Sequence, residues 1–168
     1  MNYFELFDIP EALVVDKTQL ARRYFELQKK YHPDFYTGAT ETEKAAVLEK
    51  SALVNKAFKT FQNTDATIQY VLQLKGLVEE EEKYALPADF LMEMMELNEA
   101  LTEDGQLPEG LLADAENALY DSVRPIIEGY KPNGTTGGEL AQLKEYFYKK
   151  KYLLRIKERI RNIAPPNG

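Results

Sequence analysis

Apolar side chains recur every three or four residues through most of this chain, which is the spacing of one face of an α-helix. No segment alternates apolar and polar residues with the period of two that indicates a strand. The sequence therefore predicts an all-α protein. We expect helices at residues 2–8, 16–31 and 40–61, in a fourth segment that ends at Gly76, and at residues 86–102, 108–128 and 139–163.

The second expected helix carries the most regular pattern and ends at an unusual junction. Asp16, with Gln19 three residues later, is typical of the capping box that begins a helix. Pro33 forces the chain out of the helix, because proline has no N–H and its ring clashes with the preceding turn. His32, the only histidine, therefore lies between two helices that must pack on each other, and residues 35–38 are expected to form a loop. The apolar stripe of this helix consists of Leu20, Tyr24, Leu27 and Tyr31.

The same helix has a basic face beside its apolar stripe, with Glu26 as its one acidic neighbour in that stretch. A solvated charged surface is the ordinary explanation of such a face. The concentration of like charge nevertheless favours an acidic protein or a polyanion as a binding partner. The basic face consists of Arg22, Arg23, Lys29 and Lys30.

Charge is distributed unevenly along the chain, whose net charge is −7. Residues 76–130 carry a net charge of −13 and residues 131–168 a net charge of +6. We interpret the two segments as facing each other within one domain. The alternative is a nucleic-acid-binding module. It would use Lys149, Lys150, Lys151, Arg155, Lys157, Arg159 and Arg161.

A run of four carboxylates at residues 79–82 indicates where the chain divides. Repulsion among these side chains opposes their burial, so the run favours an exposed linker. The sequence predicts a first domain over residues 1–76, an acidic linker over 77–85 and a three-helix bundle over 86–168.

The helix expected at 86–102 has apolar residues on two sides. Its core row is Phe90, Met94, Leu97 and Leu101, and roughly opposite lies a row of Met92, Glu96, Glu99 and Glu103. Leu91 and Met95 fall well round the helix from the core row. A wide apolar stripe is the ordinary explanation. A binding surface explains the pattern better, because Leu and Met cluster beside a charged rim and Met adapts to irregular partners.

Catalysis is not indicated by the residue inventory. His32 could act as a general base, but no Ser or Cys stands in a nucleophile motif, and the chain contains no Cys. The sequence lacks a second His for a transition-metal site, a calcium-loop spacing and a glycine-rich phosphate loop. No apolar run is long enough to span a bilayer, and the first residues do not form a signal peptide. We expect a protein that is not an enzyme and has no cofactor, metal or membrane segment.

Several motifs, in this order, resemble those of one known family. A J-domain has two helices that flank a His-Pro-Asp motif, and this chain looks like one at His32-Pro33-Asp34. The second of its two helices carries Val54-Asn55-Lys56-Ala57-Phe58. Three segments make the resemblance more specific. With them, the whole chain is similar to the HscB family, the J-domain co-chaperones of iron-sulfur cluster assembly. These segments are Asn2-Tyr3-Phe4-Glu5-Leu6-Phe7, Leu27-Gln28-Lys29-Lys30-Tyr31-His32-Pro33-Asp34 and Phe90-Leu91-Met92-Glu93-Met94-Met95-Glu96-Leu97.

The resemblance implies a fold, two partners and their binding residues. The J-domain would bind a DnaK-type, HscA-like chaperone and stimulate its ATPase, and the bundle would hold the scaffold protein IscU. The chaperone-binding residues would be Arg22, Arg23, Lys29, Lys30, His32, Pro33 and Asp34. The scaffold-binding residues would be Leu91, Met92, Met95, Glu96, Glu99, Glu103 and Phe147, with Tyr146 and Tyr148 as rivals of Phe147.

Some features leave alternatives open. General J-domains often carry basic residues where this chain has Phe25 and Glu26, so the choice among DnaK-type chaperones stays open. A general J-domain co-chaperone that hands unfolded clients to such a chaperone is the main alternative function. The resemblance implies partners that are proteins, with no nucleic acid and no membrane. It implies a cytoplasmic location, or the mitochondrial matrix if a transit peptide has been removed.

Overall fold

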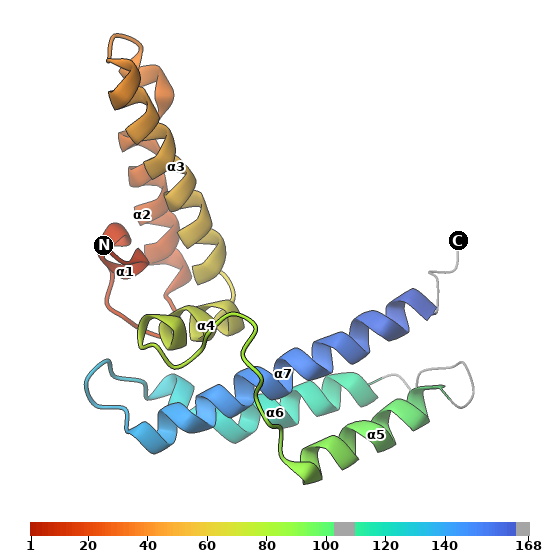
Figure 1. The fold of residues 1–168 in the computed structure, drawn as a ribbon. Helices are drawn as coiled ribbons and strands as arrows, with labels where there is room; N and C mark the ends of the chain where they lie inside the picture. Colours follow the sequence, from red (N-terminus) through yellow and green to blue (C-terminus); the bar gives the residue numbers. More distant parts are fainter. Residues whose placement is uncertain (103–109, 164–168) are drawn as a thin grey trace. The chain divides into compact units, whose positions relative to one another are not determined.

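The structure, a computed structural model, describes residues 1–102 and 110–163, with side chains for residues 1–100 and 110–162 (Figure 1). Every regular element in these ranges is helical, which confirms the all-α prediction. The elements are α1 (Tyr3–Phe7), α2 (Lys17–Lys30), the 3-10 helix η1 (Pro33–Tyr36), α3 (Glu41–Phe61), α4 (Thr64–Leu74), α5 (Ala88–Thr102), α6 (Leu111–Glu128) and α7 (Gly137–Ile163).

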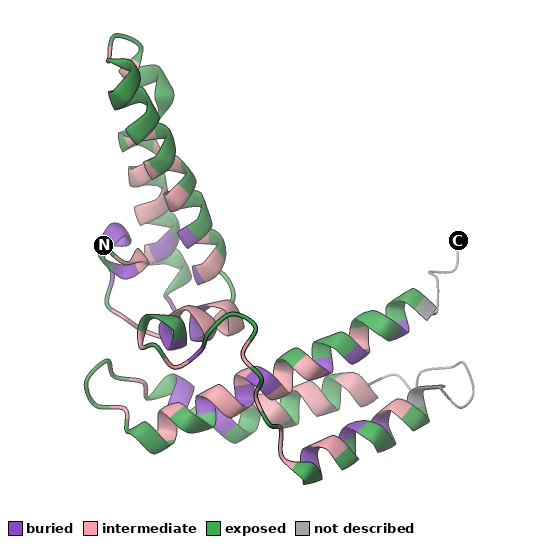
Figure 2. Ribbon diagram, viewed as in Figure 1, coloured by how far each residue is buried: buried purple, intermediate pink, exposed green. Residues whose placement is uncertain are grey.

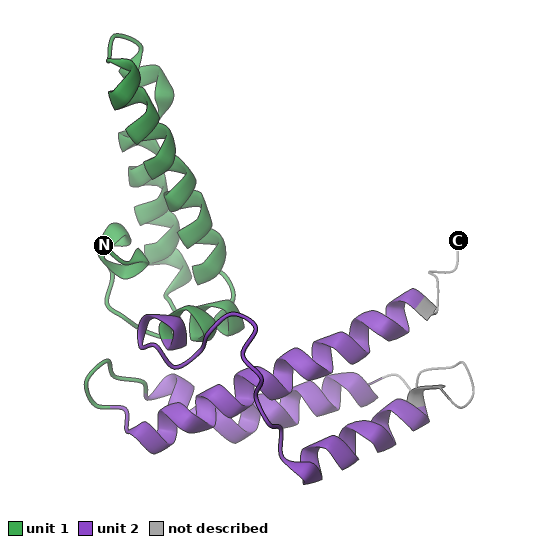
Figure 3. Cartoon of the chain, in the orientation of Figure 1, with its two compact units in different colours: residues 1–71, 130–134 green, residues 72–129, 135–168 purple. Residues whose placement is uncertain are grey.

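The chain forms two compact units, which Figure 3 distinguishes by colour. Unit 1 comprises residues 1–71 with the short segment 130–134, and unit 2 comprises residues 72–129 and 135–168. The border therefore falls inside α4. The predicted division into a first domain, an acidic linker and a bundle stays a prediction.

Unit 1 is built on a hairpin of two long antiparallel helices, α2 and α3 (Figure 1). Asp16 begins α2, because its side-chain oxygen accepts a hydrogen bond from the Gln19 N–H at 2.8 Å. Thr40 and Glu43 form a reciprocal capping box that begins α3. Both helix starts thus follow from local sequence.

The core of unit 1 lies at the end of the hairpin where α1 packs, as Figure 2 shows. Phe61 of α3 contacts the rings of Phe4 and Phe7, at centroid distances of 4.8 and 5.6 Å. Towards the loop between α2 and α3 the helices become mostly exposed. The hairpin is therefore anchored at one end and presents its other end to solvent. The fully buried residues of this core include Phe7, Leu13, Leu20, Val54, Ala57 and Ile68.

The loop that we expected at residues 35–38 is in part a helix. Residues 33–36 form η1, a single 3-10 turn, and Thr37 and Gly38 follow it. Proline suits the first position of a helix, because its fixed φ fits and its missing N–H would have no partner there. His32 caps this turn, since its Nδ1 accepts a hydrogen bond from the Asp34 N–H at 3.3 Å.

Unit 2 contains the three helices of the C-terminal bundle. Helices α6 and α7 run antiparallel, and α5 packs against α7 in the same direction as α7 (Figure 1). The buried cluster at their centre is Phe90, Met94 and Leu97 of α5 with Leu153, Ile156 and Ile160 of α7. The structure confirms these three members of the predicted core row on α5, whereas the side chain of Leu101 lies outside the described residues.

The ends of the bundle helices differ slightly from prediction. Helix α6 begins at Leu111 after Gly110, whose φ of 92° suits glycine, and it continues through Pro125 to Glu128. Helix α7 begins at Gly137, two residues earlier than we expected. The turn expected at residues 105–108 lies outside the described residues.

Candidate functional site

The His-Pro-Asp turn, residues His32, Pro33 and Asp34, lies at the solvent-exposed end of the hairpin. The side chains of His32 and Asp34 are 51% and 86% exposed, and His32 Nδ1 lies 3.5 Å from Asp34 Oδ2. The Tyr36 hydroxyl donates a hydrogen bond to the Lys30 carbonyl at 2.8 Å, which ties η1 to the last turn of α2. The turn is therefore held in one arrangement while its polar groups face solvent.

The four basic residues of α2 have different surroundings. Arg23 forms ion pairs with Asp8 and Glu26, both at 3.3 Å, so it links α2 to the residue that ends α1. Arg22, Lys29 and Lys30 are exposed. The Lys29 ammonium lies 4.7 Å from the centre of the Phe25 ring, which is itself exposed. Arg23 thus serves the fold, whereas the other three are available to a partner.

A network between α2 and α3 holds the hairpin below the turn. Asn55 Oδ1 accepts hydrogen bonds from the Tyr24 hydroxyl and from Gln28 Nε2, both at 2.7 Å. Tyr24 also stacks on Phe58, and Val54 and Ala57 are buried. In the segment Val54–Phe58 that marked the resemblance, every residue except the exposed Lys56 therefore faces α2 or the core.

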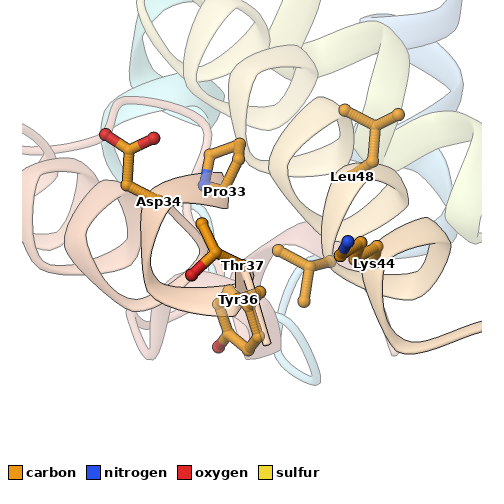
Figure 4. A pocket seen from close by; sticks show the side chains of 7 residues that line it. Pro33, Asp34, Tyr36, Thr37, Lys44 and Leu48 are labelled. Atoms are coloured by element: carbon orange, nitrogen blue, oxygen red, sulfur yellow. The ribbon is translucent and has the colours of Figure 1, made fainter. Parts of the chain in front are cut away.

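A pocket of about 440 Å³ lies between η1 and α3, beside the His-Pro-Asp turn (Figure 4). Pro33 forms one side of it, and the exposed Leu48 of α3 forms the other. Its remaining lining is Asp34, Tyr36, Thr37, Lys44 and Val47. Sequence reasoning did not find this pocket, because it depends on how η1 folds back towards α3.

Helix α5 exposes the apolar residues that the sequence placed away from its core. Met92 and Met95 are 64% and 62% exposed, and Leu91 is half-buried. Glu96 and Glu99 are also exposed. We call these five residues the α5 surface. Glu103, which we expected at its rim, lies outside the described residues.

Helix α7 carries two aromatic residues that could lie beside the α5 surface, the expected Phe147 and Tyr152. Phe147 is half-buried and contacts Tyr148, and the Lys151 ammonium lies 5.9 Å from its ring centre. Tyr152 instead packs edge-on against Phe90 of α5, with centroids 6.0 Å apart. Phe147 is about 140° round α7 from Tyr152, so the two rings point to different sides of the helix.

The two rivals of Phe147 are less suited to a binding surface. Tyr146 and Tyr148 are buried, with 3% and 8% of their surface exposed. The α5 residues lie on one helix, and whether Phe147 completes their surface stays a prediction. Tyr152 was missed because its position in the α7 pattern reads equally well as core.

The acidic run is attached to α7 at one point. Glu82 accepts hydrogen bonds from Lys144 at 2.9 Å and from the Tyr148 hydroxyl, and Tyr84 stacks on Tyr148. The hydrogen bonds from Tyr148 and Lys144 lower the pKa of Glu82. Burial and the hydrogen bond to Glu82 raise the pKa of Tyr148. Glu79, Glu80 and Glu81 are exposed, as expected of a linker.

Basic residues of α7 pair with acidic residues of the preceding block within unit 2. Glu116 of α6 lies 3.7 Å from the Lys150 ammonium and 3.2 Å from that of Lys157. Lys144 pairs with Glu82. These contacts support the interpretation that the acidic and basic segments face each other within one domain.

Two further properties concern the described residues alone. In residues 1–102 and 110–163, no group of three or more His, Asp or Glu side chains could hold a metal ion. None of the helices in the same ranges is long and apolar enough to cross a membrane.

Comparison with known proteins identifies the family. No family model matches the chain. The co-chaperone protein HscB homolog of Shewanella amazonensis is 38% identical over 129 residues, covering 75% of this chain and 74% of the relative. The homolog of Vibrio vulnificus (strain CMCP6) is 32% identical over 167 residues, covering 95% of each chain.

Solved structures of the same family share the fold. The crystal structure of human co-chaperone protein HscB has a TM-score of 0.75 and 30% identity, covering 99% of this chain and 84% of that chain. Chaperone HscB from Vibrio cholerae has a TM-score of 0.68 and 26% identity, covering 97% of each. With its J-domain hairpin, its helical bundle and relatives that match along nearly its full length, the chain belongs to the HscB family of co-chaperones.

Proposed function

We propose that this co-chaperone binds the iron-sulfur scaffold protein IscU through the α5 surface and delivers it to a DnaK-type, HscA-like chaperone. The His-Pro-Asp turn and the exposed basic residues of α2 bind that chaperone and stimulate its ATPase. One observation carries the proposal: unit 1 and unit 2 each expose one of the two expected binding surfaces. A protein that brings a client to a chaperone needs two such separate surfaces.

The chaperone half of the proposal follows from the exposure of the turn. Asp34 is 86% exposed and His32 about half exposed, yet the hydrogen bond between them and the one from Tyr36 hold the turn in place. A ligand shifts a conformational equilibrium only through differential affinity for the two states. The turn accordingly stimulates hydrolysis by binding the hydrolysis-competent state of the chaperone more tightly than its other states.

The scaffold half follows from the two methionines. Met92 and Met95 expose more than three-fifths of their surface, while Met94 between them is buried in the core. Exposed apolar side chains that cluster beside carboxylates are typical of a protein-binding surface. The partner surface on IscU should therefore combine apolar side chains with basic ones.

The test measures steady-state ATP turnover by the chaperone, alone and with IscU, as this protein is added. We expect the unmodified protein to raise turnover, and the increase to be larger with IscU present. His32→Gln should abolish the increase in both cases while it leaves helix content and IscU binding unchanged. Normal stimulation by His32→Gln would refute the J-domain role of the turn.

A second measurement separates the scaffold role from that of a general J-domain co-chaperone. IscU binding is measured directly by calorimetry, in competition with an unfolded polypeptide. Saturable IscU binding that the unfolded polypeptide does not displace supports the proposal. Displacement by unfolded polypeptide, with no preference for IscU, would instead favour the general J-domain function.

A further inference from the structure

The two exposed phenylalanines of this protein flank the His-Pro-Asp turn. All eight phenylalanines lie within the described residues, and Phe25 and Phe35 are the two that are exposed, at 62% and 73%. Phe25 lies on α2, seven residues before His32, and Phe35 lies on η1 immediately after Asp34. Burying a phenylalanine is favourable, so two unburied side chains on either side of one motif call for an explanation.

Each of these two rings contacts one of the expected chaperone-binding residues. The Lys29 ammonium lies 4.7 Å from the centre of the Phe25 ring. The His32 ring meets the Phe35 ring edge-on, with centroids 6.1 Å apart. Both aromatic side chains are thus in contact with residues that the family resemblance assigns to the chaperone, and the apolar groups belong to the same surface as the charged ones.

We propose that Phe25 and Phe35 are apolar anchors of the chaperone-docking surface, so that docking is not purely electrostatic. Phe25 and Phe35 insert into apolar depressions on the chaperone, and carboxylates around those depressions pair with Arg22, Lys29 and Lys30. This inference rests on the proposed function, since it concerns the same docking event. It specifies the partner surface: apolar at its centre and acidic at its edge.

The charge pattern favours an acidic chaperone surface over a second copy of this protein as the partner of Phe25 and Phe35. The basic residues around Phe25 disfavour a second copy of the same face, because like charges would be brought together. An acidic, partly apolar protein surface satisfies both features. Aromatic side chains buried at the centre of an interface tend to dominate its affinity, whereas exposed ion pairs at the rim contribute little.

The experiment measures the concentration of this protein that gives half-maximal stimulation of chaperone ATP turnover, at 50 and 500 mM KCl. The variants are Phe25→Gln, Phe35→Gln and the double variant, with Val14→Gln as a matched control. Val14 is an apolar side chain of unit 1 that is 51% exposed and lies away from the turn. Phe25→Leu, which retains an apolar side chain, serves as the conservative variant.

We expect each single Phe→Gln variant to raise the half-maximal concentration about tenfold at both salt concentrations. Maximal stimulation and the melting temperature should be unchanged. Phe25→Leu should lie close to the unmodified protein, and Val14→Gln should be indistinguishable from it. Salt should weaken all variants by a similar factor, because the charged residues are intact in each.

Several results would overturn the inference. They are unchanged half-maximal concentrations in the double variant, a loss that disappears at 500 mM KCl, or an effect confined to self-association in sedimentation or to binding of unfolded polypeptide. Failure of the unmodified protein to stimulate the chaperone at all would instead refute the proposed function. The two failures are therefore distinguishable.

Discussion

Tyr24 of α2 stacks on Phe58 of α3, with ring centroids 3.8 Å apart and ring planes at 14°. The Tyr24 hydroxyl at the same time donates a hydrogen bond to Asn55 Oδ1 at 2.7 Å. One side chain thus joins the two helices through both its face and its polar tip. Because the hairpin has few buried residues beyond this point, the pair sits where the packed core gives way to the exposed end that carries the His-Pro-Asp turn.

The first prediction concerns the stability of this pair. In a double-mutant cycle of Tyr24→Leu and Phe58→Leu, measured by urea unfolding, we expect a coupling free energy of about 0.5–1.5 kcal/mol. Tyr24→Phe retains the ring and removes the hydroxyl, so it should cost about 1 kcal/mol for the lost hydrogen bond. Strictly additive losses in the cycle would mean that the stacking contributes no specific energy.

The second prediction separates two basic residues of α2. Lys29→Glu should weaken chaperone binding, more strongly at low salt, without changing the free energy of unfolding, because Lys29 is exposed. Arg23→Glu should also weaken binding, and it should destabilise the fold by roughly 1 kcal/mol, because Glu would then face Asp8 and Glu26. Chaperone affinity and urea unfolding are measured for both variants. Equal stability of the two variants would contradict the structural role of Arg23.

The third prediction concerns the pH dependence of the contact between the linker and α7. The pKa of Glu82 is lower in the folded protein than the ordinary value of 4.5, because Tyr148 and Lys144 donate hydrogen bonds to its carboxylate. The contact therefore contributes its full stabilisation above that ordinary value, and the contribution is lost as the pH falls through the lowered pKa. The ring-proton NMR signals of Tyr84 and Tyr148 should report this titration below pH 4.5.

The matched control for this titration is Glu82→Gln. This variant should remove that transition from the Tyr84 and Tyr148 signals, because it lacks the carboxylate that accepts the Tyr148 hydrogen bond. Glu80→Gln alters an exposed carboxylate of the same run, and its transition should match that of the unmodified protein. A transition that persists in Glu82→Gln would show that another group causes it.

Much of the fold followed from the sequence because its signals are local. Asp16 and the pair Thr40 and Glu43 mark helix starts within four residues, and the stripe on α5 separates core from surface by periodicity alone. We expected residues 35–38 to form a loop, because the residue pattern does not show the backbone hydrogen bond from the Phe35 N–H to the His32 carbonyl, at 3.1 Å, that closes the 3-10 turn.

Other features depend on contacts between distant residues. In the sequence, Glu82 is one of four consecutive carboxylates that are all expected to be solvated. Its hydrogen bond with Lys144, 62 residues away, depends on the position of α7 in the fold. Helix α7 carries aromatic or apolar residues on several sides, so its sequence does not show which side α5 covers. The family resemblance implies Phe147, whereas the contact of Tyr152 with Phe90 becomes apparent only in the structure.

The fourth prediction contrasts neighbouring methionines of α5. Replacing both Met92 and Met95 by Ala should weaken IscU binding by on the order of 2 kcal/mol or more, because exposed apolar anchors lose their contacts with the partner. The melting temperature should change little, and stimulation of the chaperone by this protein alone should persist. Met94→Ala should instead cost about 2–5 kcal/mol of stability, because Met94 is buried in the core. A large loss of melting temperature in the double variant would place these side chains in the core.

The fifth prediction decides which aromatic residue of α7 belongs to the IscU-binding surface. The sequence resemblance favours Phe147, and the structure favours Tyr152, whose ring lies against Phe90 beside the start of the α5 surface. We expect Tyr152→Ala to weaken IscU binding by about tenfold and Phe147→Ala to weaken it less. A partner that covers α5 reaches the adjacent side of α7 first, and Phe147 points about 140° away from that side.

Calorimetric titration with IscU measures both affinities. Tyr152→Phe keeps the ring and controls for loss of packing against Phe90, so it should bind IscU as the unmodified protein does. A stronger loss in Phe147→Ala than in Tyr152→Ala would restore the assignment made from the sequence.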